Sequence, residues 1–82
     1  MYPQVLKNVR VADKAAVRSN AAVQKALAKA GEKLNGNGRV LLRESGTEPV
    51  VRVMAEADTV TLCERVVDSV VSVIRSEGLA ED

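Results

Sequence analysis

Apolar and polar residues alternate in three segments of the chain, and each segment predicts a β-strand. On one side of residues 5–11 every position is valine except Lys7, which is typical of a strand at the edge of a sheet. Residues 39–42 form a short, mostly apolar run, and residues 50–57 are rich in β-branched side chains. One side of this third segment is expected to face the core; it consists of Val51, Val53, Ala55 and Ala57. The other side is mixed, as suits a cleft or an interdomain surface; it consists of Val50, Arg52, Met54 and Glu56.

The segment 21–34 repeats its apolar residues at steps of three and four and predicts a helix. It is rich in Ala, Lys, Gln and Leu, which favour the helical state, and Asn20 is suited to cap its first turn. The Asn-Gly-Asn-Gly sequence at 35–38 is expected to end the helix in a turn. Residues 12–20 are mixed and predict no element. The apolar face of this helix consists of Val23, Ala26, Leu27, Ala30 and Leu34.

A second helix is expected to begin at Asp58 or Thr59 and to end at Gly78. Valine, its commonest apolar residue, is a mediocre helix former, so this helix depends on packing. The apolar stripe consists of Cys63, Val66, Val67, Val70, Val73 and Ile74. Residues 79–82 should fray, although a short fourth strand near Ala80 is left open.

The elements follow the order β-α-β-β-α and predict an α+β fold with two layers. We expect an antiparallel sheet of three or four strands with two helices packed on one face. Eighty-two residues make a single small domain, 1–82, of modest stability. Because the chain lacks Phe and Trp, many small aliphatic contacts must supply the core, as suits a domain that evolved beside others. The start of the chain directly before a strand also suggests a domain taken from a longer protein.

The composition excludes several classes of function. Lys and Arg number 12 and Asp and Glu 11, and the interleaved charges give no broad field for nucleic acid or an anionic membrane. No apolar run approaches the ~20 residues of a membrane span, and no signal-peptide pattern is present. The single cysteine, Cys63, allows no internal disulfide, fits the reducing cytoplasm, and should be a buried core thiol. The absence of His excludes imidazole catalysis and His metal ligation.

Candidate chemistry is concentrated between the second and third expected strands. Arg43 and Arg52 can form bidentate hydrogen bonds to phosphate oxygens. Ser45 and Thr47 offer hydroxyl donors, and Gly46 allows close approach and the angles that turn successive N–H groups toward one point. Together these groups surround a phosphate monoester with donors. Neither His nor Lys adjoins the serine, so the cluster lacks an activated nucleophile and we assign no catalytic residue.

Other interpretations of these residues stay open at this stage. Ser, Gly and Pro also make plain hairpin turns that bind nothing. Glu48 either orients an arginine or stabilises the hairpin, and neither it nor Glu44 has a partner at metal-ligand spacing, so no metal site is expected. Met54 is either an interdomain contact or a partly buried residue. Five further cations are expected to form a solvated face; they are Lys14, Arg18, Lys25, Lys29 and Lys33.

Two segments carry a family resemblance. Residues 38–54, Gly-Arg-Val-Leu-Leu-Arg-Glu-Ser-Gly-Thr-Glu-Pro-Val-Val-Arg-Val-Met, resemble the C-terminal signature of the α-D-phosphohexomutases, which usually reads Arg-Pro-Ser-Gly-Thr-Glu-Pro followed by an arginine. Residues 2–11, Tyr-Pro-Gln-Val-Leu-Lys-Asn-Val-Arg-Val, resemble the opening of this domain in the phosphoglucosamine mutase branch. With the Ala-rich helix between them, the two segments cover about two thirds of the chain.

The resemblance implies that 1–82 is the fourth, C-terminal domain of a four-domain enzyme. The other domains would carry a phosphoserine, a magnesium-binding loop and a sugar-selecting loop, so magnesium is expected in the parent enzyme and no cofactor in this domain. The parent would interconvert glucosamine 6-phosphate and glucosamine 1-phosphate through a bisphosphorylated intermediate, on the path to cell-wall precursors. This domain would hold the non-reacting phosphate and be inactive alone. The family's phosphate contacts carry over onto Arg43, Ser45, Gly46, Thr47 and Arg52.

Two residues depart from the family pattern. Glu44 stands at the usual proline, which loosens the loop and puts a negative charge beside an anion site, and we expect it to face solvent. Lys7 replaces a usual apolar residue and indicates an exposed edge. Neither departure removes a phosphate donor.

Three alternatives remain to this interpretation. The first is the same domain from a phosphomannomutase or phosphoglucomutase. The second is a free-standing binding module for nucleic acid, against which the lack of aromatic residues for base stacking counts. The third is a structural or regulatory domain whose loop is only a turn. As partners we expect a phosphosugar and the parent's other domains, and neither nucleic acid nor membrane.

Overall fold

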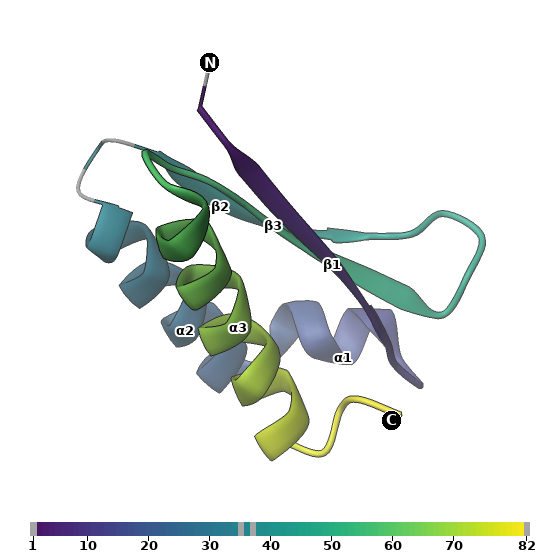
Figure 1. The fold of residues 1–82 in the computed structure, drawn as a ribbon. Coiled ribbons are helices and arrows are strands. Elements are labelled where there is room, and N and C mark those ends of the chain that lie inside the picture. The colour runs from purple at the N-terminus through teal and green to yellow at the C-terminus, as the bar shows by residue number, and fades with distance from the viewer. Residues whose placement is uncertain (1, 35, 37, 82) are drawn as a thin grey trace.

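The computed structural model describes residues 2–34, 36 and 38–81. In chain order its elements are β1 (Gln4–Arg10), α1 (Lys14–Ser19), α2 (Ala21–Leu34), β2 (Arg39–Glu44), β3 (Val50–Glu56) and α3 (Val60–Ser76). Strand β3 is central: the strand order is β1-β3-β2, and β3 pairs antiparallel with both neighbours. Figure 1 shows the three helices on one face of this sheet, and no helix or strand of the described residues covers the other face. The predicted α+β fold with an antiparallel sheet is confirmed, and the observed order is β-α-α-β-β-α.

The additional helix, α1, is the one that the apolar pattern did not reveal. Asp13 caps it, because its Oδ1 accepts hydrogen bonds from the backbone N–H groups of Ala15 (3.0 Å) and Ala16 (3.2 Å). Val17, on the inner side of the helix, is fully buried. Six residues make fewer than two turns, which is too short to display a helical repeat. A helix of this length is stable only through its tertiary contacts.

The α2 helix has the predicted bounds. The Oδ1 atom of Asn20 accepts a hydrogen bond from the N–H of Val23 (3.0 Å), and the Asn20 carbonyl accepts one from the N–H of Gln24 (3.0 Å). The predicted apolar face points inward, although Ala26 and Leu27 are only partly buried. The fully buried members of the face are Val23, Ala30 and Leu34.

The turn after α2 requires glycine at two positions for different reasons. Gly36 has a positive φ of 78°, in the region that glycine favours. At Gly38 a Cβ atom would collide with the carbonyl oxygen of Glu56, because the two backbone segments approach closely there. Asn35 and Asn37, the other residues of the predicted turn, lie outside the described residues.

The α3 helix begins after its N-cap, Thr59, as predicted. Its buried side differs from the predicted stripe at one position: Val71 is 4% exposed, whereas Val73 is only partly buried. The reason is that α3 packs against both the sheet and α2, so its buried face is wider than one stripe. Cys63 is fully buried and its Sγ donates to the carbonyl of Pro3 (3.4 Å), which confirms the core thiol. The other confirmed stripe residues are Val66, Val67, Val70 and Ile74.

Strand β1 lies at an edge of the sheet, as predicted. Lys7 is on its helix side and forms an ion pair with Asp68 of α3, so it marks the exposed margin of the core. The apolar side of β3 faces the helices and is fully buried, as is Ala57, which directly follows the strand; the strand residues are Val51, Val53 and Ala55.

The C-terminal segment is docked on the domain, which corrects the expectation that it frays. Gly78 ends α3 with a φ of +73°. The chain then returns to β1, where Ala80 forms an isolated antiparallel bridge with Val11 and the N–H of Glu81 donates to the carbonyl of Arg10 (2.9 Å). These backbone hydrogen bonds hold the segment against β1. The fourth strand that the sequence left open is therefore present only as a single bridge. Asp82 lies outside the described residues.

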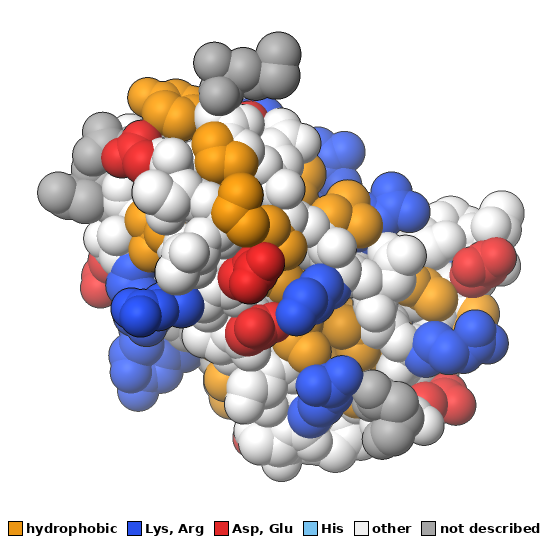
Figure 2. Space-filling view, in the orientation of Figure 1, with side chains coloured by type: hydrophobic (Ala, Val, Ile, Leu, Met, Phe, Trp, Pro, Cys, Tyr) orange, Lys and Arg blue, Asp and Glu red, His pale blue; other side chains and the backbone are white. Residues whose placement is uncertain are grey.

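Charges of both signs are interspersed over the face of the molecule drawn in Figure 2. This agrees with the formal net charge of +1 and with the absence of a broad basic field in the sequence. Within the part of the chain that the structure describes, no helix is both long and apolar enough to cross a membrane.

Candidate anion-binding site

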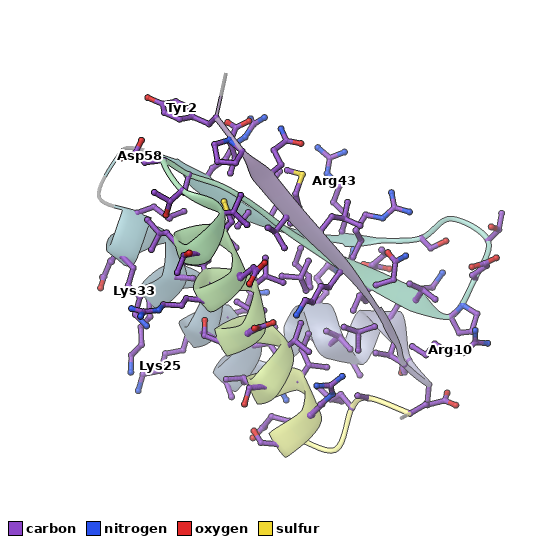
Figure 3. The ribbon with its side chains drawn as sticks, in the orientation of Figure 1. Tyr2, Arg10, Lys25, Lys33, Arg43 and Asp58 are labelled. Atoms are coloured by element: carbon purple, nitrogen blue, oxygen red, sulfur yellow. The ribbon has the colours of Figure 1, made fainter. Side chains whose placement is uncertain are left out.

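The uncovered face of the sheet brings the two predicted arginines together. Arg43 on β2 and Arg52 on β3 are direct cross-strand partners, so their side chains leave the sheet on the same side. That side is the one opposite the helices, where Figure 3 shows Arg43. Asn8 of β1 completes the row: it is the partner of Arg52 in the other ladder, and its Oδ1 accepts a hydrogen bond from Arg52 Nε (3.2 Å).

Neither arginine of this pair has a carboxylate partner among the described residues. Two other arginines do: Arg39 lies 3.7 Å from Glu56, and Arg18 lies 3.0 Å from Glu44. Like charges directly opposite each other on a sheet are destabilising. An anion placed between the two guanidinium groups would remove this repulsion and accept their hydrogen bonds.

The loop 45–49 between β2 and β3 is closed by its own hydrogen bonds. The N–H of Ser45 donates to the carbonyl of Val50 (3.0 Å), and the N–H of Val50 donates to the carbonyl of Glu48 (2.8 Å). Ser45 Oγ accepts hydrogen bonds from the N–H groups of Thr47 (3.4 Å) and Glu48 (3.2 Å). Two successive N–H groups therefore donate to one side-chain oxygen, and Ser45 Oγ holds the turn of the loop.

Gly46 differs from the expectation in one respect. Its φ is not positive, so the loop does not need glycine for an otherwise unfavourable backbone angle. A Cβ atom at this position would meet no other atom within 4 Å. The glycine instead leaves open space beside the arginines, into which a ligand can approach the backbone.

The loop is held from the helix side by α1. The Nζ of Lys14 donates to the carbonyl of Ser45 (2.6 Å), and Arg18, one turn later, pairs with Glu44. Lys14 and Arg18 are therefore not merely a solvated face, as the sequence suggested, whereas Lys25, Lys29 and Lys33 are exposed as expected. In the sequence, the spacing of four residues between Lys14 and Arg18, directly after the capping Asp13, was the available signal that the two share a helical face.

Among the described residues, neither glutamate beside the site forms an ion pair with Arg43 or Arg52. Glu44 is exposed, as expected; it lies on the helix side of β2, since it is the cross-strand partner of buried Val51, and it pairs there with Arg18. Among the described residues no ion pair joins Glu48 to Arg43 or Arg52. The backbone of Glu48 takes part in two loop hydrogen bonds, which favours its role in the hairpin.

Two adjoining depressions on the uncovered face share Arg43 and Arg52. The polar one, about 270 Å³, is lined by Arg43, Glu44, Ser45, Gly46, Val50 and Arg52. The other, about 200 Å³, is lined by Leu6, Arg39, Leu41, Arg43, Arg52 and Met54. The structure thus brings four of the five predicted residues to one depression, and Thr47 lies exposed in the same loop. Met54 is partly buried at the centre of the apolar row between Leu6 and Leu41.

The groups gathered here are hydrogen-bond donors and two cations, which are suited to an anion. No group of three or more Cys, His, Asp or Glu side chains within residues 2–34, 36 and 38–81 is arranged to hold a metal ion. The donor set of guanidinium, amide and hydroxyl groups suits a tetrahedral oxyanion and does not suit magnesium, which prefers oxygen ligands.

Comparison with known protein families identifies the class of protein to which this fold belongs. A model of the family described as phosphoglucomutase/phosphomannomutase, C-terminal domain, matches residues 6–73, and the chain belongs to this family. Similar curated proteins include several phosphoglucosamine mutases. The chain is 52% identical over 80 residues to the phosphoglucosamine mutase of Lachnospira eligens, covering 98% of this chain and 18% of that protein. It is 54% identical over 82 residues to the phosphoglucosamine mutase of Lysinibacillus sphaericus, covering 99% and 18%.

Solved structures of the α-D-phosphohexomutase superfamily have the same fold. The N-acetylphosphoglucosamine mutase of Aspergillus fumigatus in complex with GlcNAc-6P and magnesium superposes with a TM-score of 0.77 at 29% identity, over 94% of this chain and 16% of that chain. An N-acetylglucosamine-phosphate mutase in its substrate complex gives a TM-score of 0.74 at 33% identity, over 89% and 15%. The resemblance inferred from the two sequence segments is confirmed, and the chain spans less than a fifth of the length of these relatives.

Proposed function

We propose that this chain is the phosphate-binding C-terminal domain of a phosphoglucosamine mutase. Its parent is a four-domain cytoplasmic enzyme that interconverts glucosamine 6-phosphate and glucosamine 1-phosphate through a bisphosphorylated intermediate, for cell-wall precursors. The domain binds the phosphate that is not reacting, through Arg43, Ser45, Gly46, Thr47 and Arg52. Magnesium and the phosphoserine belong to the other domains.

The observation that carries this proposal is the uncompensated pair of arginines beside the loop. Arg43 and Arg52 share a face and a depression, and neither has a carboxylate partner among the described residues. Hydrogen bonds from guanidinium to phosphate are charge-assisted and bidentate, so a phosphate monoester is the ligand class that fits this pair. The open space at Gly46 lets the ligand reach the loop backbone.

A site that contacts only phosphate fits a reaction in which the intermediate must turn around. Each end of a bisphosphorylated sugar can occupy such a site in turn, because the site makes no contact that depends on the sugar. Binding energy from the held phosphate then positions the other phosphate for reaction. The domain has no activated nucleophile of its own, so the isolated chain is expected to be inactive.

The uncovered face of the sheet is the side on which we place the substrate cleft and the other domains. An apolar row crosses this face from Leu6, which is 47% exposed, through Met54 to Leu41. It adjoins the arginine pair directly, and an apolar row open to solvent gains from being covered by another domain.

The test is an NMR titration of this chain with glucosamine 6-phosphate and, separately, with inorganic phosphate. Shifts should concentrate at the amides of Ser45, Gly46, Thr47 and Arg52. Arg43→Ala should weaken binding about tenfold or more, because a charge-assisted pair of hydrogen bonds is lost. Arg39→Ala is the matched control: it removes the same charge from the same face of β2, where Arg39 already has a carboxylate partner. Equal effects of the two variants, or no shift at millimolar ligand, would refute phosphate binding by this loop.

The sugar specificity is tested in the parent enzyme. The similarity to phosphoglucosamine mutases favours glucosamine phosphates over the phosphates of mannose and glucose. Full-length enzyme should therefore turn over glucosamine 1-phosphate with the highest kcat/KM. A preference for mannose or glucose 1-phosphate would assign the chain to the phosphomannomutase or phosphoglucomutase branch instead.

A further inference from the structure

Helix α1 places two cations beneath two consecutive residues at the end of β2. Lys14 Nζ lies 2.6 Å from the carbonyl oxygen of Ser45 in a part-buried contact, and Arg18 NH1 lies 3.0 Å from a carboxylate oxygen of Glu44. Both contacts are on the helix side of the sheet, whereas Arg43 and Arg52 lie on the uncovered side. The loop is thus held from the side opposite to the arginine pair.

We propose that Lys14 is a positioning residue for the phosphate-binding loop: it fixes the peptide between Ser45 and Gly46 so that the Gly46 N–H points toward the bound phosphate. This inference rests on the proposed function. Arg18 assists by neutralising Glu44, which precedes Ser45 in the chain and borders the polar depression from the helix side of β2. Neither cation contacts the phosphate itself.

The geometry of the peptide group between Ser45 and Gly46 determines where the Gly46 N–H points. Among the described residues no peptide bond is cis, and in a planar trans peptide the C=O of one residue and the N–H of the next point in opposite directions. The Ser45 carbonyl points to Lys14 on α1. The N–H of Gly46 therefore points away from α1, toward the side where the arginines lie.

Two further features make this N–H suited to a ligand. No hydrogen bond within the described residues uses it, and the space around Gly46 is open. A cation bound to the carbonyl also polarises the peptide, which strengthens the N–H as a donor. Lys14 thereby acts on the anion through the backbone, without adding a charge to the depression.

The ion pair of Arg18 and Glu44 has a smaller, electrostatic effect. Glu44 replaces the proline that is usual in this family's loop signature, and its negative charge, next in sequence to Arg43 and Ser45, opposes the binding of an anion there. Arg18 offsets that charge, but its side chain is 68% exposed, so solvent screens much of the interaction. Lys14 is therefore the contact on which the test depends.

The test compares Lys14→Met, Lys14→Arg and the control Lys25→Met by NMR. Methionine keeps the length of the lysine stem but removes the charge and the donor, whereas arginine keeps both. Lys25 is an exposed lysine on α2, which Figure 3 shows away from the loop. Two quantities are measured in each variant: the ¹⁵N heteronuclear NOE of Gly46 without ligand, and the Kd for inorganic phosphate.

Lys14→Met should lower the NOE of Gly46 and raise the Kd roughly three- to tenfold, because binding must then order a backbone peptide that the lysine no longer holds. Lys14→Arg should restore the Kd to within about twofold, and Lys25→Met should change neither quantity. An unchanged NOE at Gly46, or a Kd within about twofold of the parent chain in Lys14→Met, would overturn the inference. If the parent chain itself shows no phosphate shift, the proposed function fails, while the NOE of the unliganded loop still decides whether Lys14 positions Gly46.

Discussion

Gly38 and Gly46 flank β2 and occupy opposite environments. At Gly38 the backbone of Glu56 is so close that no side chain fits, whereas at Gly46 a Cβ would meet no atom within 4 Å. The first glycine is therefore required by packing between strands, and the second leaves room for a ligand. Alanine at Gly38 should therefore mainly affect the stability of the fold, whereas alanine at Gly46 should mainly affect phosphate binding.

Gly38→Ala should lower the free energy of unfolding by about 2 kcal/mol or more, since a backbone carbonyl cannot move aside cheaply. Gly46→Ala should change it by less than about 1 kcal/mol, because its φ is not positive and its surroundings are open. Phosphate affinity should show the reverse order, with the larger loss in Gly46→Ala. Urea unfolding and NMR titration of both variants measure the two quantities. A stable Gly38→Ala variant would contradict the close approach of the two backbones.

At the scale of elements, α1 connects the stability of a short helix to the order of a loop. It carries Lys14 and Arg18, and it is held in place by its Asp13 cap and the buried Val17. A helix of six residues has few other sources of stability. Loss of the Asp13 cap should therefore also make the loop 45–49 less ordered.

Asp13→Ala should lower the free energy of unfolding by about 1 kcal/mol and speed amide exchange in both α1 and the loop 45–49. Thr59→Ala is the matched control, because it removes the corresponding cap from α3 at a similar cost but leaves the loop contacts intact. Hydrogen exchange followed by NMR measures both effects. Faster exchange in the loop of Thr59→Ala, or none in Asp13→Ala, would show that α1 does not hold the loop.

Elements that depend on local signals were predictable from the sequence, and those that depend on distant contacts were not. The bounds of α2 follow from the cap at Asn20 and the glycine-rich turn after Leu34. The partners of Lys14 and Arg18 lie more than 20 residues away in the chain, beyond the reach of any periodic pattern. The cross-strand pairing of Arg43 and Arg52 was predictable in part, since a hairpin must bring residues on either side of its loop together.

At the scale of the whole molecule, segments from both ends of the chain meet at the end of β1 that adjoins the loop. The C-terminal segment bonds to Arg10 and bridges Val11, and the N–H of Val11 donates to the carbonyl of Pro49 in the loop (2.9 Å). The C-terminus is drawn in yellow beside this end of β1 in Figure 1. The last described residues therefore hold the end of β1 in place, and that end is bonded to the binding loop.

Truncation after Gly78 should lower the free energy of unfolding by about 1–2 kcal/mol. It removes the packing of Leu79 and Ala80 on the core and the backbone bond from Glu81 to Arg10. Thermal unfolding followed by far-ultraviolet circular dichroism measures the loss. The double substitution Glu81→Ala and Leu79→Ala keeps the chain length and should reproduce the loss of packing but retain the backbone bond. Full stability of the truncated chain would mean that the tail adds nothing to the fold.

Valine is the commonest residue of the core, and this lowers the side-chain entropy that is lost when the chain folds. Eleven of the seventeen buried apolar residues in the described part of the chain are valines. Valine has a single side-chain torsion, which its branched Cβ already restricts in the unfolded chain, so burial costs it less rotamer freedom than it costs longer side chains. Each valine buries a modest area but also loses little disorder, and a core of this kind has few alternative packings. The sheet that carries the two arginines therefore rests on a layer of side chains with almost no freedom to rearrange when an anion arrives or leaves.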